Sequence, residues 1–299
     1  MWLNRNRRRA AWLAGPVLLL LHDICPVAGA YTAAGDRIFP ATVLLPQIGP
    51  TDEAYFTGFT VPQDPSLGDT RDSSLAMTWS KTITDRLSLT MTGTYSANQL
   101  TGGGTAYGWQ NFDTSAQYLA VVNPAHEFLM SFGLDQNFGG TGAIGVGASR
   151  QGSTTPAIYL GKGLGDYDIG LLRPLAIAGF AGYQIDDSAP ASNAFQSGLV
   201  VEYSFPYLVS KVAPIAMPDF LRATTLMCEF EFNNPIGGNA AKASVTVAPG
   251  FNYAGQGWDI GLEALLPATS SAGRGIGVIA QLHFSLDYLM PNSIGRPLL

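Results

Sequence analysis

The sequence predicts an all-β protein, a transmembrane antiparallel β-barrel of about 12 strands closed by the C-terminal strand. First, segments of about ten residues with alternating apolar and polar side chains recur along the chain, separated by turn residues, as in transmembrane β-strands. Second, charged residues make up only 13% of the 299 residues, against about 25% in an ordinary soluble domain. Third, no uninterrupted run of about 18 apolar residues follows residue 30, so a helical membrane span is not predicted.

The clearest alternating segment covers residues 275–288. Its apolar side chains alternate from Ile276 to Tyr288, and period-two alternation gives a strand one apolar and one polar face. The polar face carries Gln281, His283, Ser285 and Asp287. A strand that crosses a bilayer obliquely needs about 9–11 residues. We therefore expect this segment to span a membrane and to close the barrel by pairing with the first strand.

The other strands are predicted from the same pattern, taken in chain order. Ser74 begins the regular part of the chain, and Arg86–Asn98 alternates most strictly, with Gly102–Gly104 ending it as a loop. The turn at Asn123-Pro124 predicts a hairpin between its flanking segments. The segments predicted in the first half are 75–84, 86–98, 113–122, 127–137, a weakly patterned 142–149, and 157–162.

The second half follows the same rule, with one interruption. The segments are 175–185, 195–205, 222–232, 242–253, 258–266 and 275–288. Prolines at positions 206, 214 and 218 interrupt the alternation, so residues 206–220 are predicted to form a longer excursion, a plug or a short helix. A soluble β-sandwich is the alternative fold, but strand length and low charge favour the barrel.

Residues 1–30 have the features of a secretory signal peptide. Four arginines between Arg5 and Arg9 precede the apolar run Ala10–Leu21, and Ala28-Gly29-Ala30 is a small-residue cleavage site. An N-terminal membrane anchor is the alternative, but the apolar run is too short for one. Residues 31–73, rich in proline, are predicted to be an irregular N-terminal segment docked at or inside the barrel, and residues 74–299 to form the barrel.

Charge and cysteine content exclude several classes of function. Removing residues 1–30 takes four arginines and one aspartate from totals of 16 basic and 22 acidic residues, which leaves a formal net charge of −9. Nucleic-acid binding is not expected, because it requires basic patches. Cys228 is the one cysteine after residue 30, so neither an intrachain disulfide nor a thiolate metal site is predicted, and we expect no metal or other cofactor.

Three stretches give the chain a resemblance to a known class. They are residues 157–166 (AIYLGKGLGD), residues 172–175 (LRPL), and the ending from Gln281 to Asp287 and from Ser293 to Leu298. The chain resembles a bacterial outer-membrane β-barrel and is similar to transporter-like barrels of the phenol-degradation meta-pathway type. It departs from many such barrels, which end on an aromatic residue, by continuing past Tyr288 to Leu299.

The resemblance implies a porin-like transporter in the outer membrane of a Gram-negative cell. Its expected partners are outer-membrane lipid, a small-molecule solute and the outer-membrane assembly machinery. The implied function is a channel or transporter for small solutes, hydrophobic or cationic ones among them. The alternatives are an outer-membrane lipid hydrolase and a structural barrel with a plugged lumen.

Polar side chains on the strands are predicted to line the lumen. They are Asp135, Glu202, Glu229, Glu231, Asp259, Glu263, Gln281, His283 and Asp287. An acidic lining would favour cations. Alternatively, these carboxylates are paired and only keep the interior hydrated, or the lumen is filled by side chains or by residues 31–73.

His283, Ser285 and Asp287 also resemble the His-x-Ser pair of outer-membrane phospholipases. The spacing places all three on the polar face, whereas a lipid hydrolase needs its pair at the lipid face. Same-face neighbours lie about 7 Å apart, and no Asn or Asp is clearly placed to orient His283. We therefore predict no catalytic residue and no enzymatic activity.

Overall fold

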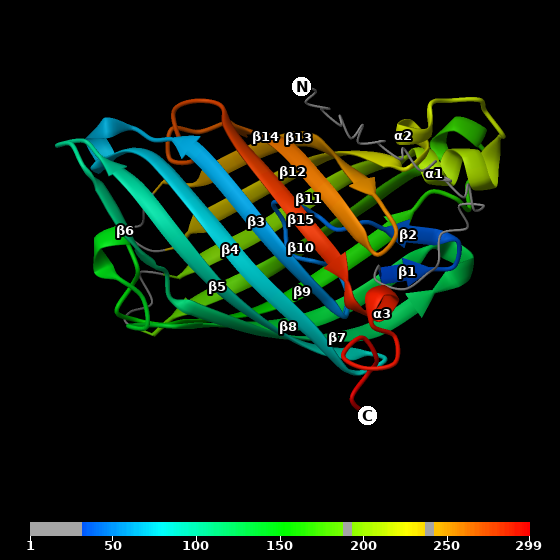
Figure 1. Cartoon of the computed structure of the whole chain (residues 1–299), viewed down its shortest axis with the longest axis horizontal. Coiled ribbons are helices and arrows are strands. Elements are labelled where there is room, and N and C mark those ends of the chain that lie inside the picture. The colour runs from blue at the N-terminus through cyan, green and yellow to red at the C-terminus, as the bar shows by residue number, and fades with distance from the viewer. Residues whose placement is uncertain (1–31, 188–192, 237–241) are drawn as a thin grey trace, which may run out of the picture.

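A computed structural model describes residues 32–187, 193–236 and 242–299, so the predicted signal peptide lies outside the described residues. Twelve antiparallel strands form a closed barrel, with one further strand outside the ring. This confirms the predicted fold class and strand number. Figure 1 shows the barrel from the side, with its strands strongly tilted.

The ring runs through neighbouring strands in chain order. Its strands are β3 (Glu53–Pro62), β4 (Asp69–Thr84), β5 (Leu87–Leu100), β7 (Phe112–Asn123), β8 (Phe128–Phe138), β9 (Ser153–Gly163), β10 (Leu175–Asp186), β11 (Ala194–Ser204), β12 (Thr224–Pro235), β13 (Ser244–Ala254), β14 (Trp258–Pro267) and β15 (Gly277–Ser285). β15 pairs with β14 on one side and with β3 on the other, so it closes the ring. The strand outside the ring, β6 (Thr105–Trp109), pairs with the C-terminal half of β5 (residues 95–99). The N-terminal half of β5 (residues 87–92) pairs with β7.

The barrel begins earlier than expected, because β3 lies within the segment predicted to be irregular. Tyr55, Phe59 and Val61 alternate with outward residues such as Phe56, which is 43% exposed. Both faces of β3 are therefore rich in apolar groups, since its inner face packs against an apolar interior. This pattern lacks the apolar–polar alternation that identified the later strands.

The C-terminal strand is shorter than predicted. β15 ends at Ser285, and the short helix α3 (Leu286–Leu289) follows, so Asp287 and Tyr288 are not on the strand. The chain then returns to the barrel, where Leu298 N and Leu299 N donate to the carbonyl groups of Thr82 and Ile83.

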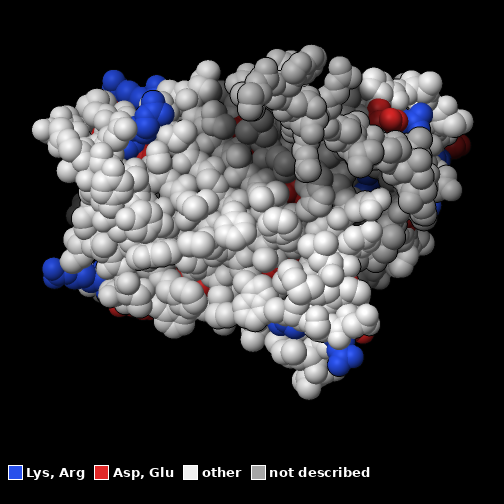
Figure 2. Space-filling view, viewed as in Figure 1, with Lys and Arg blue, Asp and Glu red and all other residues white. Residues whose placement is uncertain are grey.

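Along β15 the side chains face as the alternation predicts. Val278 and Leu282 are exposed on the outside, whereas Gln281, His283 and Ser285 are buried inside. On the face shown in Figure 2, lysine and arginine side chains gather near the two ends of the barrel and the wall between them is mostly uncharged. None of the helices in the described ranges is long and apolar enough to cross a membrane.

The two ends of the barrel differ. At the terminal mouth, where β3 begins and β15 ends, most connections are short, and the longer 205–223 connection contains α1 (Phe205–Tyr207), a π-helical turn (Leu208–Val212) and α2 (Asp219–Arg222). The predicted excursion at 206–220 thus contains short helical segments joined by the irregular residues 213–218, and it lies at this mouth (Figure 1). The opposite mouth carries longer loops, such as residues 139–152.

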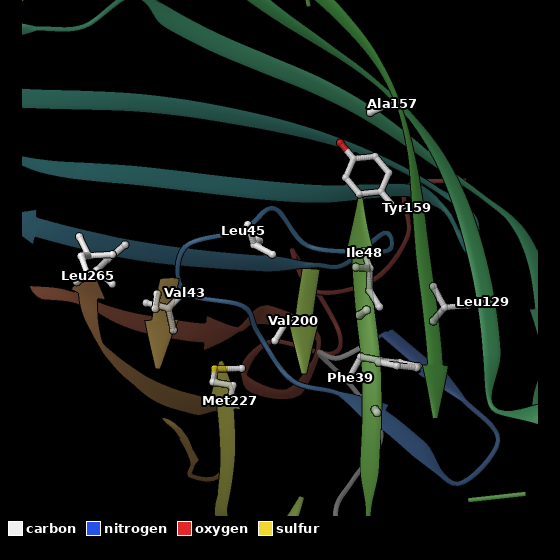
Figure 3. Close-up of a cluster of buried hydrophobic side chains, with 14 of the residues drawn as sticks. Phe39, Val43, Leu45, Ile48, Leu129, Ala157, Tyr159, Val200, Met227 and Leu265 are labelled. Carbon is white, nitrogen blue, oxygen red and sulfur yellow. The ribbon is translucent and has the colours of Figure 1, made fainter. Parts of the chain in front are cut away.

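Residues 32–52, called segment 32–52 below, occupy the interior. β1 (Thr32–Ala34) and β2 (Arg37–Phe39) form a separate two-stranded sheet, and residues 40–52 continue without regular strand structure. Figure 3 shows Phe39, Val43, Leu45 and Ile48 packed among side chains of the wall. Those wall residues are Leu129, Tyr159, Val200, Met227 and Leu265.

Candidate functional site: the barrel interior

A cavity of about 510 Å³ opens at the opposite mouth, and we call it the vestibule. Its lining includes three carboxylates and several amide side chains, among them Asp113, Asp135, Asp186, Asn111, Gln184 and Gln196. Among the described residues, no lysine or arginine lines it. The vestibule is therefore an acidic space lined by many hydrogen-bonding groups.

Tyr159 separates the vestibule from the apolar interior. Its hydroxyl group donates to Asp135 Oδ2 at 3.3 Å, while its ring is 3% exposed and stacks on Phe180 with the centroids 6.0 Å apart. Below the ring lie Leu45 and Ile48 of segment 32–52 (Figure 3). The polar entrance thus ends on a floor made by the wall and segment 32–52 together.

Glu229 holds the middle of segment 32–52. Its carboxylate accepts three consecutive backbone N–H groups, from Val43 at 2.7 Å, Leu44 at 3.1 Å and Leu45 at 2.6 Å. Glu229 is fully buried, and Glu202 and Glu263 on nearby strands are buried almost completely beside it. The carboxyl oxygens act as acceptors here, and the three amides supply the donors that this buried group requires.

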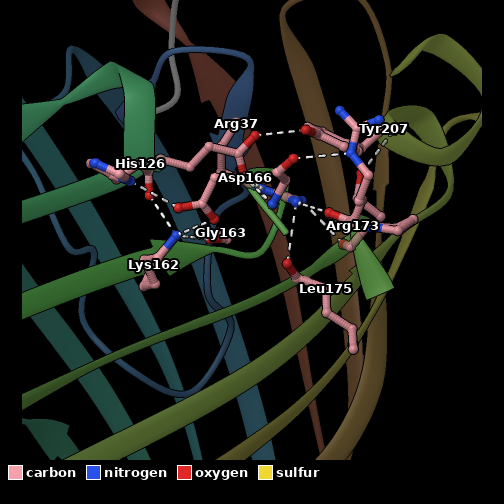
Figure 4. Close-up of polar contacts among 12 residues, drawn as sticks. Arg37, His126, Lys162, Gly163, Asp166, Arg173, Leu175 and Tyr207 are labelled. Atoms are coloured by element: carbon pink, nitrogen blue, oxygen red, sulfur yellow. Dashed lines mark hydrogen bonds and ion pairs between the residues drawn. The ribbon is translucent and has the colours of Figure 1, made fainter. Parts of the chain in front are cut away.

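Arg37 anchors the hairpin of β1 and β2 at the terminal mouth (Figure 4). Its guanidinium group donates to Glu127 Oε2 at 3.2 Å and to the carbonyl groups of Arg173, Pro174 and Leu175. The Tyr207 ring lies 4.0 Å from the Arg37 Cζ atom. Arg37 is fully buried, so these bonds fix the hairpin against the loops of the wall.

Glu127 joins this anchor to the helical excursion. It accepts from the Tyr207 hydroxyl group at 2.6 Å, and burial together with this bond raises the pKa of Tyr207 to about 12. Nearby, Lys162 Nζ donates to Asp166 Oδ1 at 2.6 Å, and this bond lowers the pKa of Asp166. The Arg37 anchor thus lies beside the partly exposed ion pair of Lys162 and Asp166 at the terminal mouth.

His283 joins three strands in the interior. Its Nδ1 atom lies 2.7 Å from Asp259 Oδ2 on β14, and its Nε2 atom lies 2.7 Å from Glu53 Oε2 on β3. Carboxylates accept but do not donate, so the ring makes both bonds as an imidazolium. Asn252 on β13 extends the cluster by donating to Asp259 Oδ1 at 2.7 Å and to the Ala41 carbonyl group at 3.3 Å.

Asp52 fixes the end of segment 32–52 where it enters β3. It forms an ion pair with Lys81 and accepts from the Thr82 hydroxyl group and, at 3.2 Å, from the Thr82 backbone N–H. Lys81 also donates to the Arg296 carbonyl group at 2.7 Å, which ties the C-terminal tail to the same point.

The structure places the predicted lumen residues in four different settings. Asp135 lines the vestibule, and Glu231 is half-buried on β12. Six are buried in the filled interior: Glu202, Glu229, Asp259, Glu263, Gln281 and His283. Asp287 lies in α3 beyond the end of its strand, because the chain leaves the sheet at Ser285.

The expectation that no acidic residue orients His283 is wrong, because Asp259 does so from the adjacent strand. Both ring nitrogens nevertheless contact carboxylates, which leaves neither free to accept a proton from Ser285. His283 and Ser285 also face the interior, as their parity predicted.

Sequence reasoning missed the partners of these residues. Arg37, Asp52 and Glu53 lie in the segment expected to be irregular. Glu127 was placed at the start of the predicted strand 127–137, but it lies in the turn before β8. Arg37 carried one usable signal, because it is a charged residue beside the apolar stretch Ile38–Leu45. A charge next to a segment expected to dock inside a barrel requires a buried partner.

No protein-family model matches the chain, and no curated protein sequence matches it. Among solved structures it is similar to the COG4313 outer membrane channel from Pseudomonas putida F1, with a TM-score of 0.53 and 11% identity over 83% of this chain and 99% of that one. The KdgM porin in complex with disordered oligogalacturonate gives a TM-score of 0.47 and 11% identity over 78% and 98%. The outer membrane phospholipase of Salmonella typhi gives a TM-score of 0.39 and 9% identity over 80% and 92%.

At such low identity the likeness concerns the fold alone. The closed ring, the mostly uncharged wall on the face shown in Figure 2 and the similarity to the Pseudomonas channel agree on one point. The chain has the fold of the outer-membrane β-barrels.

Proposed function

We propose that the protein is an outer-membrane channel for small solutes, which enter at the vestibule. The observation that carries this proposal is the polar cavity of about 510 Å³ inside one mouth of the barrel. Three of the connections at the terminal mouth span only two to four residues (85–86, 124–127 and 255–257), although the 205–223 connection there is long. These short turns support an orientation with the vestibule outside the cell. The narrower similarity, to transporter-like barrels of the phenol-degradation meta-pathway type, remains part of this proposal.

The charge of the lining supports a preference for cations. Asp113 and Asp135 lie within the vestibule, and its described lining contains no basic side chain. Acidic groups in a pore entrance raise the local concentration of cations and lower that of anions.

Ion selectivity in planar bilayers tests the proposal. We expect the wild-type protein to conduct and its reversal potential in a KCl gradient to report cation preference, with Asp135→Asn shifting that potential toward zero. Asp166→Asn, which removes the same charge at the terminal mouth, is the matched control and should change it little. Absence of conductance and of solute flux into liposomes would contradict the channel.

A structural barrel with a plugged lumen is the second candidate, and the packing of segment 32–52 in the interior favours it. The same bilayer recordings distinguish the two, since a permanently plugged barrel passes no current. We propose in addition that the chain is not a hydrolase, which is supported by the two carboxylates bound to His283. Lipase activity that disappears in Ser285→Ala would contradict this.

A further inference from the structure

The channel proposed above has an interior that is filled at its terminal end. We propose that segment 32–52 is an autoinhibitory gate latched by Glu229, and that the channel opens when the segment withdraws through the terminal mouth. This inference rests on the proposed channel function.

Segment 32–52 can leave without disturbing the wall. β1 and β2 pair only with each other, in a sheet separate from the barrel sheet. Between residues 40 and 48, the hydrogen bonds between the segment and the wall are made by wall side chains. Glu229 accepts from the amides of residues 43–45, Asn252 donates to the Ala41 carbonyl group, and Gln117 donates to the Gln47 carbonyl group at 3.0 Å. Withdrawal therefore breaks no ladder hydrogen bond of the ring.

The inner wall behind segment 32–52 carries carboxyl groups, which can be solvated by water when the segment is absent. Glu202, Glu229 and Glu263 are each at most 2% exposed while segment 32–52 is docked, although they face the interior of the barrel. Buried carboxyl groups are costly unless they are hydrogen-bonded, and a permanently packed core would more simply be apolar at these positions. Withdrawal would hydrate all three carboxylates, which offsets part of the apolar contact that is lost.

Glu229 is the natural latch because one side chain holds three consecutive residues of the segment. Glu229→Gln keeps the size of the side chain but replaces one acceptor oxygen with a donor group, so it cannot accept from all three amides. Glu231→Gln is the matched control, because it removes the same charge two residues along the same strand and accepts none of these three bonds.

The hinge of the gate lies where the segment joins β3. Asp52 is held by Lys81, and the next residue, Glu53, is held by His283. The anchor at the other end is the Arg37 cluster at the terminal mouth (Figure 4). Opening thus requires release at Glu229 and Arg37, while Asp52 keeps the segment attached to the wall.

A reversible disulfide tests the gate directly. A Cβ atom at Gly261 on β14 would lie 3.5 Å from the Val43 Cβ atom, within the usual disulfide range of about 3.5–4.5 Å. The test protein is Val43→Cys with Gly261→Cys in a Cys228→Ser background, and heat-modifiable migration on gels verifies that it folds. Thr78→Cys with Thr92→Cys, opposite each other on β4 and β5, joins two wall strands and is the control cross-link.

We expect the Val43–Gly261 pair to lose conductance when oxidised and to regain it when reduced, while the control cross-link conducts in both states. We also expect Glu229→Gln to raise the open fraction above that of the wild type and Glu231→Gln to leave it unchanged. Equal conductance of the oxidised and reduced Val43–Gly261 pair would overturn the gate and leave the channel standing. If the wild type, the reduced pair and Glu229→Gln are all silent, both the gate and the channel are refuted.

Discussion

At position 283 a single imidazole ring joins β15 to both of its neighbours. The two carboxylates that it contacts come from β3 and β14, and all three side chains are at most 3% exposed. Removing the ring leaves two buried carboxylates without their shared partner. Uncompensated buried charges of this kind strongly lower the stability of the fold.

We expect His283→Ala to lower the free energy of unfolding by about 3–5 kcal/mol. Urea-induced unfolding in detergent or lipid vesicles, followed by tryptophan fluorescence, measures this. Ser285→Ala, two residues along on the same buried face, is the control, with an expected loss below about 1.5 kcal/mol. Equal stability of the two variants would show that the cluster contributes nothing.

Asp287 predicts a dependence of stability on pH. Burial raises the pKa of this carboxyl group in α3 to about 6, above its usual 3.8. A raised folded-state pKa means that the protonated form favours folding, so this contribution is complete below about pH 4 and is lost as the pH rises through about 6. Because Asp287 is only half-buried, the effect is about 1 kcal/mol after screening.

We therefore expect Asp287→Asn to be more stable than the wild type at pH 7 and of equal stability at pH 4. Unfolding midpoints at the two pH values measure the difference. Asp166→Asn is an informative comparison, because its hydrogen bond with Lys162 lowers the pKa of Asp166. Losing this hydrogen bond should destabilise the protein at pH values above the pKa of Asp166. The expected effect on stability is therefore opposite in sign to that of Asp287→Asn.

The residue scale also shows what the sequence could not predict. Alternation correctly placed His283 on the inner face, but the contact with Asp259 depends on the register between β14 and β15. Register is set by turn geometry and packing across strands, which one strand's pattern does not contain. The contact between Glu53 and His283 could not be predicted either, because the strand that carries Glu53 was not predicted.

Among the elements, the hairpin of β1 and β2 depends on its turn at Gly35. Gly35 has a φ of +65°, and a Cβ atom there would lie 2.4 Å from the Pro124 carbonyl oxygen. Glycine is thus required both by the backbone conformation and by the close approach of the β7–β8 connection.

We expect Gly35→Ala to release the hairpin from the wall, because strain in the left-handed region alone costs about 1–2 kcal/mol. Limited proteolysis should then cleave within segment 32–52 faster than in the wild type, while the barrel remains resistant. Gly103→Ala is the matched control, since it has a φ of +90° with no atom within 4 Å of the added Cβ. Identical proteolysis of Gly35→Ala and Gly103→Ala would contradict the role of the close contact.

Elements with an apolar outer face and a polar inner face were predicted well, and β5 and β15 are the best examples. β3 was missed because its inner face is apolar as well. The same packing explains the interior position of segment 32–52, for which the sequence offered proline content and one apolar stretch but no periodicity.

On the scale of the whole molecule, the ring and the gate are separate units that meet at residue 52. Deleting residues 32–48 should leave a closed barrel, because all twelve ring strands remain. Deleting residues 32–62 removes β3 and leaves β15 and β4 with unpaired edges.

Migration on gels with and without boiling separates these outcomes. We expect the shorter deletion to keep its heat-modifiable shift and the longer deletion to lose it. Retention of the shift by both would mean that β15 can pair with β4 directly and that β3 is dispensable for closure.

The seam between β3 and β15 also sets the order in which the molecule can form. Glu53 and His283, which contact each other across it, are separated by 230 positions in the chain. Loop closure over such a separation is slow, and every other pair of neighbours in the ring is much closer in sequence. The sheet must therefore remain open until its final strand pairs with β3, and until then its two edge strands present unpaired backbone N–H and C=O groups. A chaperone that shields β3 during this interval would protect the protein from pairing with the wrong molecule.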